Sequence, residues 1–362
     1  MRIEKFTNLY RDVTKEGTKI PQEKYCLTGQ FPIVDQGQRV IAGWWNDDAG
    51  IFKNVPAIIF GDHTRAIKYM EQPFFIGADG VKILRPTNIK DNPKYLYYAL
   101  QAAKIPNLGY SRHFKVVKEL QICIYSRDEQ NEIVRVLEKI DYLIEQRHAE
   151  TTYLDQLVKS RFIELFGEPL SNQKGWQTMS IVEAAPIKSQ RGDLADEVWL
   201  LNLDAVEAQT GTVLFKHRVQ SGEINASTVY FTAESVLYSK LRPYLNKVVM
   251  PDEDGVATSE MIPMYPLADR LNRAYLCYWL RSDVFVRHIS EKVAGAKMLR
   301  VSMDYFRSLA IEMPPLELQE QFAAFVEQTD KSKYYSSLSF RYCQAAANTY
   351  RQEWMTCRTS DF

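Results

Sequence analysis

The chain contains an internal repeat, and this repeat limits the possible folds more than any other feature of the sequence. Tyr95, Leu96, Tyr98 and Leu100 in KYLYYALQAAK recur 180 residues later in AYLCYWLRSDVF. Further along, LQICIYSRDEQNEIVRVLEKID matches LAIEMPPLELQEQFAAFVEQTD at an offset of 189 residues. The pairs at this second offset include Leu120 with Leu309, Ile122 with Ile311, Gln130 with Gln319 and Asp141 with Asp330. Each half therefore has the same order of segments: strands and turns, a short aromatic helix, a strand and a long helix.

The long helix of each half is predicted from apolar periodicity and from the absence of helix breakers. Residues 127–166 contain no Gly or Pro, their apolar side chains recur at spacings of three, four and seven, and Gly167 and Pro169 follow. A helix of this length would extend roughly 60 Å. A counterpart begins after Pro315 and runs toward Thr356. Because one small domain cannot bury such a stripe, we expect the two helices to pair, although two independent helical linkers are the alternative.

The predicted fold class is α+β: two mixed α/β domains separated by a long antiparallel two-helix coiled coil and related by a pseudo-two-fold internal repeat. Short β-branched and aromatic runs alternate with turn motifs such as FPIVDQGQ and WWNDDAG, which favours short strands joined by long loops. The predicted segments are a first globular domain at 1–126, a central long helix at 127–168, a second globular domain at 169–315 and a distal long helix at 316–362.

The charge is balanced over the chain but not along it. The 362 residues include 45 Lys and Arg against 45 Asp and Glu, which by itself argues against a strongly basic nucleic-acid binder. Residues 1–126, however, carry 18 basic and 12 acidic side chains. No run of 18 apolar residues occurs and the first residues are charged, so we expect a cytoplasmic protein without a membrane span. The five cysteines are scattered and never form a C-x-x-C pair, which predicts no zinc site.

The sequence lacks the usual signatures of catalysis. H-E-x-x-H, G-x-x-x-x-G-K-[ST], G-x-S-x-G and the dinucleotide G-x-G-x-x-G are all absent. The motif GDHTR places Asp62, His63 and Arg65 together, which could suggest acid–base or metal chemistry. Without a second His or carboxylate at ligand spacing, a structural or contact role is the better interpretation. The prediction is therefore no catalytic residue and no metal ligand.

Basic, amide and aromatic side chains occur at comparable points of the two halves, and we predict them as DNA contacts. Arg and Lys donate hydrogen bonds to guanine and phosphate, and Asn pairs with adenine. A charge cluster is usually only a solvated face, but duplication of the cluster in two domains favours DNA contact. The candidates are His63, Thr64, Arg65, Lys68, Arg112, His113 and Lys115 in the first half, and Lys240, Arg242, Tyr244, Asn246, Lys247, Lys297 and Arg300 in the second.

Motifs along essentially the whole chain point to one family. The first half contains FPIVDQGQ, IIFGDHTR, GADGVKILRP and LGYSRHFK, and the second contains LYSKLRPYLNKVVMPDEDGVATSE and GAKMLRVSMDYF. The helices contain EQNEIVRVLEKIDYLIEQR, LDQLVKSRFIELFG and LELQEQFAAFVEQTD. Together these motifs resemble the specificity subunits of bacterial type I restriction–modification systems. IYSRDEQ departs from the pattern because it lacks the proline that PPLELQ has before the second helix.

The resemblance implies a non-catalytic specificity subunit with two target-recognition domains, each of which reads one half of an asymmetric bipartite sequence in double-stranded DNA. It also implies docking of two modification (methyltransferase) subunits, which bind S-adenosylmethionine, and of restriction (nuclease–translocase) subunits, which use ATP and Mg. No cofactor is expected on this chain. The alternatives are a stand-alone DNA-modifying enzyme, which would itself need a cofactor or metal, and a coiled-coil scaffold without salt-sensitive DNA affinity.

Overall fold

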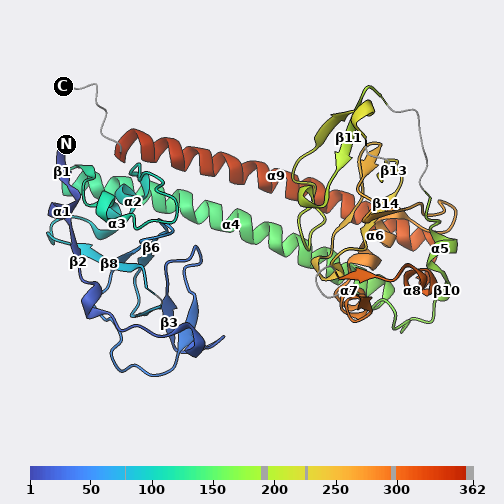
Figure 1. Cartoon of the computed structure of the whole chain (residues 1–362), viewed down its shortest axis with the longest axis horizontal. Helices are drawn as coiled ribbons and strands as arrows, with labels where there is room; N and C mark the ends of the chain where they lie inside the picture. Colours follow the sequence, from blue (N-terminus) through green and yellow to red (C-terminus); the bar gives the residue numbers. More distant parts are fainter. Residues whose placement is uncertain (78, 189–194, 225–226, 295–298, 356–362) are drawn as a thin grey trace. The chain divides into compact units, whose positions relative to one another are not determined.

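The computed structural model describes residues 1–77, 79–188, 195–224, 227–294 and 299–355. The chain divides into two compact units (Figure 1). Unit 1 comprises Met1–His148 together with the chain from Ser337 onward, and unit 2 comprises Ala149–Ser336. The helices α4 (Arg127–Phe166) and α9 (Leu316–Met355) each contribute one part to unit 1 and one part to unit 2.

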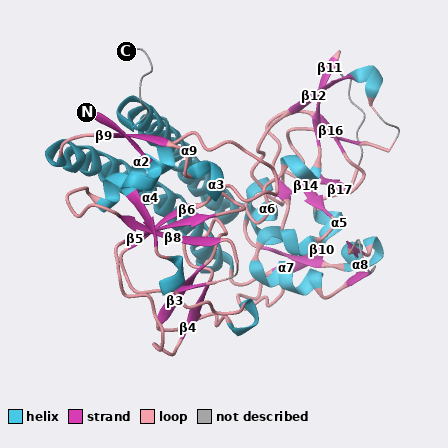
Figure 2. Ribbon diagram, turned by 60° about the vertical axis from the view of Figure 1, so that its left-hand side comes forward, coloured by secondary structure: helices cyan, strands magenta, loops and turns pink. Residues whose placement is uncertain are grey.

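Unit 1 is built around a four-stranded antiparallel sheet of order β2-β8-β5-β6. The helix α2 packs on this sheet (Figure 2). Its Tyr95 and Leu96 are fully buried with Ile58 and Phe60 of β5. A second sheet has the order β4-β3-β7, and β1 pairs with β9. The elements are β1 (Arg2–Lys5), α1 (Phe6–Leu9), β2 (Tyr10–Asp12), β3 (Phe31–Val34), β4 (Gly43–Trp45), β5 (Ala57–Gly61), β6 (Ile67–Met70), β7 (Phe75–Ile76), β8 (Val81–Pro86), α2 (Pro93–Ala102), α3 (Phe114–Val117) and β9 (Gln121–Ile124).

Unit 2 has the corresponding parts, with an extended second sheet. Its sheets have the orders β15-β14-β17 and β12-β11-β16-β13, and β10 pairs with β20 as β1 pairs with β9. The core joins the helix α6 to the strand β14 through Tyr275, Leu276 and Tyr238. The elements are β10 (Gln177–Ser180), α5 (Ile181–Ala184), β11 (Glu197–Leu201), β12 (His217–Gln220), β13 (Val229–Phe231), β14 (Val236–Ser239), β15 (Val248–Val249), β16 (Gly255–Ala257), β17 (Met261–Met264), α6 (Arg273–Arg281), α7 (Asp283–Ser290), β18 (Val293–Ala294), β19 (Arg300–Val301), α8 (Met303–Ser308) and β20 (Ala310–Met313).

The sequence repeat corresponds to a repeat of individual hydrogen bonds. The side chain of Asn92 caps α2 and that of Asn272 caps α6. The Oε1 atom of Gln130 accepts from the backbone N–H of Asn92 at 2.7 Å, and the Oε1 atom of Gln319 accepts from that of Asn272 at 2.8 Å. Both glutamines are buried, so each amide satisfies backbone groups that would otherwise lack a partner. The predicted internal repeat is confirmed at the level of single contacts.

The two predicted long helices are also confirmed. The helices α4 and α9 each contain 40 residues, and both their first and their last residues are 189 positions apart in the sequence. In unit 1, Arg351 of α9 forms an ion pair with Asp141 of α4 at 3.1 Å. In unit 2, Lys333 pairs with Asp155 at 2.7 Å, and the rings of Phe162 and Phe322 lie 5.4 Å apart. As the residue number rises along α4 in unit 2 it falls along α9, so the two helices are antiparallel there.

The predicted fold class, two mixed α/β domains with two long helices and a two-fold repeat, is therefore confirmed. The four segment boundaries predicted from the sequence stay predictions, because the compact units divide the chain within the helices. In the part of the chain that is described, no helix is long and apolar enough to cross a membrane.

Candidate nucleic-acid interface

In unit 1, two of the predicted motifs meet: the turn between β5 and β6 and the loop before α3. The backbone carbonyl of Asp62 accepts from the backbone N–H of His113 at 2.8 Å, and the Asp62 carboxylate accepts from the N–H of Phe114 at 2.7 Å. The Nε2 atom of His113 accepts from the N–H of Leu108 at 3.1 Å, which assigns the ring proton to Nδ1, 2.9 Å from the Asp62 carbonyl. His113 is fully buried and both ring nitrogens are bonded, so its side chain fixes the loop.

The turn residues themselves are braced against neighbouring loops. Arg65 has a left-handed backbone with φ of 61°, and its Nη1 donates to the carbonyl of Ile105 at 3.2 Å. The Thr64 hydroxyl donates to the backbone carbonyl of Gln36. The ring of His63 stacks on Tyr110 with centroids 5.3 Å apart, and Tyr110 is 93% exposed. This turn therefore presents its side chains from a fixed backbone.

The remaining candidates of unit 1 differ in exposure. Lys68 is buried, and its Nζ donates to the backbone carbonyl of Asp35 at 2.7 Å. Burial lowers the pKa of Lys68, and the nearby Asp35 carboxylate partly opposes this shift. Arg112 and Lys115 are exposed on the loop and on α3. Arg112 and Lys115 can thus meet a ligand directly, whereas Lys68 holds the end of β3.

Unit 2 repeats this meeting of two segments. The backbone N–H of Arg242 donates to the carbonyl of Leu299 at 2.8 Å, and the N–H of Val301 donates to the carbonyl of Lys240 at 3.0 Å. These bonds join the segment between β14 and β15 to the residues before α8. Lys297 lies outside the described residues.

The segment between β14 and β15 turns through two left-handed residues. Arg242 and Asn246 both have φ of 50°, and they flank a short 3-10 turn, Pro243–Leu245. Asn246 is buried and its Nδ2 donates to the carbonyl of Arg281 at 3.0 Å. Arg242 is exposed, and among the described residues its guanidinium has no hydrogen-bond or ion-pair partner. Tyr244 between them is 46% exposed.

Two further cations of unit 2 already have partners. The guanidinium of Arg300 binds the Glu260 carboxylate at 2.6 Å, and the hydrogen bonds it donates lower the pKa of Glu260. The Nζ of Lys247 donates to the carbonyl of Leu203 at 2.6 Å, and burial lowers the pKa of this lysine despite the nearby Asp204. Any phosphate that binds Arg300 must therefore compete with a carboxylate.

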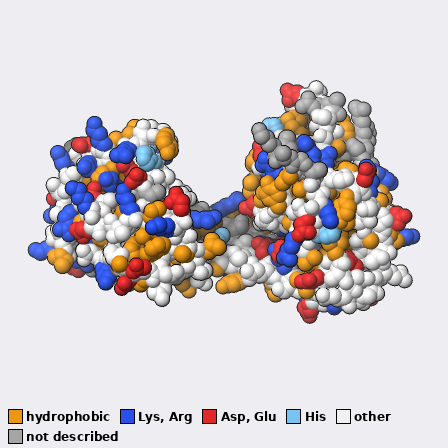
Figure 3. Space-filling view, turned by 60° about the horizontal axis from the view of Figure 1, so that its bottom comes forward, with side chains coloured by type: hydrophobic (Ala, Val, Ile, Leu, Met, Phe, Trp, Pro, Cys, Tyr) orange, Lys and Arg blue, Asp and Glu red, His pale blue; other side chains and the backbone are white. Residues whose placement is uncertain are grey.

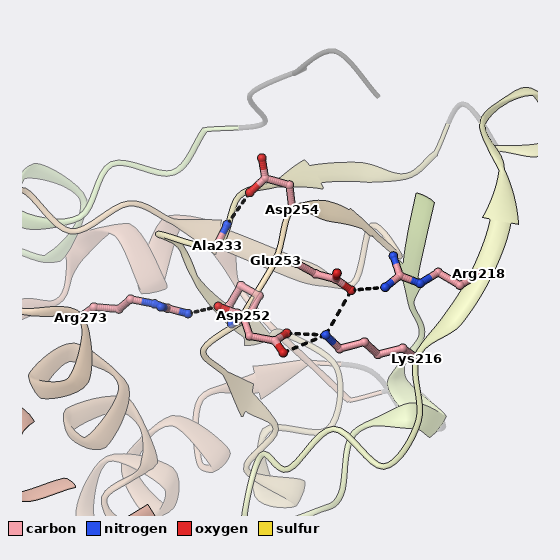
Figure 4. Close-up of polar contacts among 8 residues, drawn as sticks. Lys216, Arg218, Ala233, Asp252, Glu253, Asp254 and Arg273 are labelled. Carbon is pink, nitrogen blue, oxygen red and sulfur yellow. Dashed lines mark hydrogen bonds and ion pairs between the residues drawn. The ribbon is translucent and has the colours of Figure 1, made fainter. Parts of the chain in front are cut away.

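A group of ion pairs outside the predicted set joins the start of the edge strand β12 to residues 251–254 (Figure 4). The Nζ of Lys216 binds Asp252 at 2.7 Å and Glu253 at 3.1 Å, and Arg218 binds Glu253 at 2.7 Å. The hydrogen bond from Lys216 lowers the pKa of Asp252. Burial raises the pKa of Glu253, but the hydrogen bonds from Arg218 and Lys216 outweigh it, so the net shift is downward. The ion pairs of Lys216 and Arg218 therefore fix the turn that carries Asp252 and Glu253.

The signal for this group was present in the sequence. Lys216 and Arg218 are two positions apart, a spacing that in an extended segment puts both side chains on one side, and PDEDG supplies a turn with three acids. On the face drawn in Figure 3, basic and acidic side chains are interspersed over both units and no large patch of one sign forms. Within the described residues, no group of three His, Cys, Asp or Glu side chains is placed to hold a metal ion.

Comparison with known proteins finds a sequence match to the first part of the chain. Residues 10–153 match the family model described as the type I restriction modification DNA specificity domain. A type I restriction enzyme specificity subunit, EcoDI, from Escherichia coli is 24% identical over 156 residues, which are 42% of this chain and 34% of that protein. The match thus spans about one third of the curated relative's length.

Two solved structures share the fold over almost the whole chain. The S subunit of a type I restriction–modification system from M. genitalium aligns with a TM-score of 0.59 at 14% identity, covering 99% of this chain and 96% of that one. A chain from a structure described as the basis of complex assembly and conformational transition of the type I R-M system aligns with a TM-score of 0.54 at 13% identity, covering 97% and 96%. The fold is that of an S subunit. Residues 10–153, less than half of the chain, match the DNA specificity domain of type I restriction–modification systems, and the chain as a whole shares the fold of the S subunits.

Proposed function

We propose that this chain is the DNA-sequence specificity subunit of a type I restriction–modification complex and has no catalytic activity of its own. Each unit reads one half of an asymmetric bipartite target in double-stranded DNA. The observation that carries the proposal is the match of residues 10–153 to a DNA specificity domain, together with a second unit that repeats the same hydrogen bonds. In both units the repeat joins a turn and a loop that carry basic and aromatic side chains.

The second part of the proposal is that the helices α4 and α9 dock two modification subunits. These subunits bind S-adenosylmethionine and transfer a methyl group to an adenine that is flipped out of the duplex. Restriction subunits, which use ATP and Mg, complete the complex. This chain holds no cofactor in the proposal, and the complex acts in the cytoplasm on chromosomal DNA.

In the proposed function, the buried residues of the predicted DNA-contact set have a different role from the exposed ones. Lys68, His113 and Asn246 bond to backbone groups and position the loops. Exposed residues such as Arg112 and Arg242 meet the DNA. Since the chain has balanced charge, we expect the isolated chain to bind DNA weakly and the modification subunits to supply much of the phosphate affinity. Tight sequence-specific binding by the chain alone at physiological salt would contradict this expectation.

Mapping of adenine methylation by long-read sequencing tests the function. The host genome is compared with and without the gene for this chain, while the modification subunit is expressed in both strains. The expected result is the loss of one bipartite methylated motif when the chain is absent. An unchanged set of methylated motifs, with the chain and a modification subunit shown to be present, would overturn the proposal.

A further inference from the structure

A small hollow in unit 2 lies within the proposed DNA-reading surface. It has a volume of about 140 Å³ and two walls: the 3-10 turn Leu203–Ala205 after β11, and the segment between β14 and β15. Its lining residues are Leu203, Asp204, Leu241, Arg242, Leu245 and Lys247. The leucines supply apolar walls, and the charged residues carry one carboxylate and two cations.

The two walls are bonded together, so the hollow has a defined shape. The Nζ of Lys247 donates to the carbonyl of Leu203 at 2.6 Å, and the N–H of Gln209 donates to the carbonyl of Leu245 at 2.9 Å. The backbone N–H of Arg242 is held by Leu299. The polar groups around the hollow therefore stand on a fixed backbone, which reduces the entropy lost when a ligand binds.

The carboxylate of Asp204 differs from the other acids near this surface. Glu260 is paired with Arg300, Asp252 with Lys216, and Glu253 with Lys216 and Arg218. Asp204 is exposed, and among the described residues its carboxylate has no hydrogen-bond or ion-pair partner. Its acceptor atoms are therefore free, and its negative charge is only partly offset by the nearby Lys247.

An unpaired carboxylate on a surface that faces DNA has few attractive partners. It repels phosphates, and it has no proton to donate to guanine O6 or N7. The groups that it does complement are exocyclic amino groups, above all N4 of cytosine, which point into the major groove. Arg242, on the opposite wall, can donate to a neighbouring guanine or phosphate.

We propose that Asp204 is a specificity-determining residue that accepts a hydrogen bond from the exocyclic amino group of one base in the half-site read by unit 2. This inference rests on the proposed function and adds to it a position and a type of base. Base contact at this hollow then selects the base whose amino group lies opposite the carboxylate, and the flanking cations set the register of the contact.

The test uses the full chain assembled with its modification subunits. Three variants are compared with the wild type: Asp204→Asn, Asp204→Glu and Glu207→Gln. The last is a matched control, because it removes one negative charge three residues away on an exposed side chain that does not line the hollow. The methylated motif is mapped, and affinity is measured for duplexes substituted one base pair at a time.

We expect Asp204→Asn and Asp204→Glu to lose about tenfold or more of the discrimination at one base pair, the same pair for both variants, because one removes the carboxylate and the other displaces it. Glu207→Gln should keep the motif. If the discrimination is lost at a C·G pair, the group that donates to Asp204 is cytosine N4; if it is lost at an A·T pair, the donor is adenine N6.

Two results would overturn the inference. The first is an unchanged motif for Asp204→Asn with affinity raised by the same factor for every sequence, which would make Asp204 a simple surface charge. The second is wild-type behaviour of Asp204→Glu, since charge alone would then suffice. Absence of any methylated motif with the wild-type chain would instead reject the proposed function.

Discussion

In unit 2 the helix pair packs through Phe162 of α4, whereas in unit 1 the equivalent position of the repeat, 189 residues further along, is Arg351 of α9. The ring of Phe162 lies 5.0 Å from that of Phe166 and 5.4 Å from that of Tyr275. Arg351 instead binds Asp141 at 3.1 Å and lies over the ring of Tyr98 at 5.6 Å.

At this position of the repeat, the helix pair is thus stabilised by different chemistry in the two units. A buried aromatic cluster gains its stability from removal of apolar surface from water. A partly exposed ion pair contributes little by itself, because water screens it, although its geometry still favours one alignment of the helices. We therefore expect the helix pair of unit 2 to depend more strongly on a single side chain than that of unit 1.

The largest expected effect is that of Phe162→Ala, which removes a buried ring and leaves a cavity. Unit 2 should lose about 3–5 kcal/mol of stability. Hydrogen exchange of amides in α6 measures this loss. Phe215→Ala, at an exposed ring in the same unit, is the control and should change little. Equal losses from both variants would contradict the role of the aromatic cluster.

The shared part of the two units is tested by Gln130→Leu and Gln319→Leu. Each substitution leaves buried backbone groups without a partner and should cost about 2–3 kcal/mol. The loss should appear in α2 for the first variant and in α6 for the second, as measured by hydrogen exchange. Gln328→Leu, at an exposed position of α9, serves as the control. If only one of the two substitutions lowers stability, the repeated hydrogen bonds do not contribute equally to the two units.

The turn between β5 and β6 and the segment between β14 and β15 should differ in how loss of an arginine affects stability. Arg242→Ala should weaken DNA binding by the assembled complex by about 1–3 kcal/mol and leave the melting temperature unchanged, because its guanidinium is free among the described residues. Arg65→Ala should also lower the melting temperature, since its Nη1 bonds to Ile105. Equal melting temperatures for the two variants would contradict a stabilising role of Arg65 that Arg242 lacks.

The smallest expected effect concerns the ion pairs of Glu253, which have no equivalent among the contacts described in unit 1. Its pKa is lowered in the folded chain, so its contribution to stability is present above its ordinary pKa of 4.5 and is lost as the pH falls through the folded value. Glu253→Gln should cost about 0.5–1 kcal/mol at pH 7, and nothing once the pH is low enough to protonate Glu253 in the folded chain. Urea unfolding at both pH values measures this. The control is Glu223→Gln, since the Glu223 carboxylate has no ion-pair partner in the described chain; a pH-independent difference for Glu253→Gln would contradict the assignment.

Much of the fold could be predicted from the sequence because the repeat preserves side chains that make the same contact. Gln130 and Gln319 are examples, and the breaker-free stretches gave both long helices. Strand pairing could not be predicted. The strand β3 lies parallel to β7, and β11 lies parallel to β16, across long loops. Such pairings depend on the path of the chain rather than on local periodicity.

The candidate site could be predicted only in outline. The sequence marked the turns and loops that meet in each unit, but residue type does not show whether a cation faces a ligand or a carbonyl of its own chain. Lys68 and Asn246 are cases in which burial decides this. Asp204 lies outside the basic, amide and aromatic side chains predicted from the sequence, because a carboxylate is an acceptor alone and repels phosphate; the role proposed for it uses that acceptor on a base.

The division of the helices between the units also sets an order of events during synthesis. Unit 2 is one continuous stretch of sequence, whereas the part of α9 that belongs to unit 1 is synthesised after all of unit 2. Asp141 therefore leaves the ribosome 210 residues before its partner Arg351. The contacts of unit 1 with α9 stay unformed throughout that interval, and we expect their formation to be among the last steps of folding.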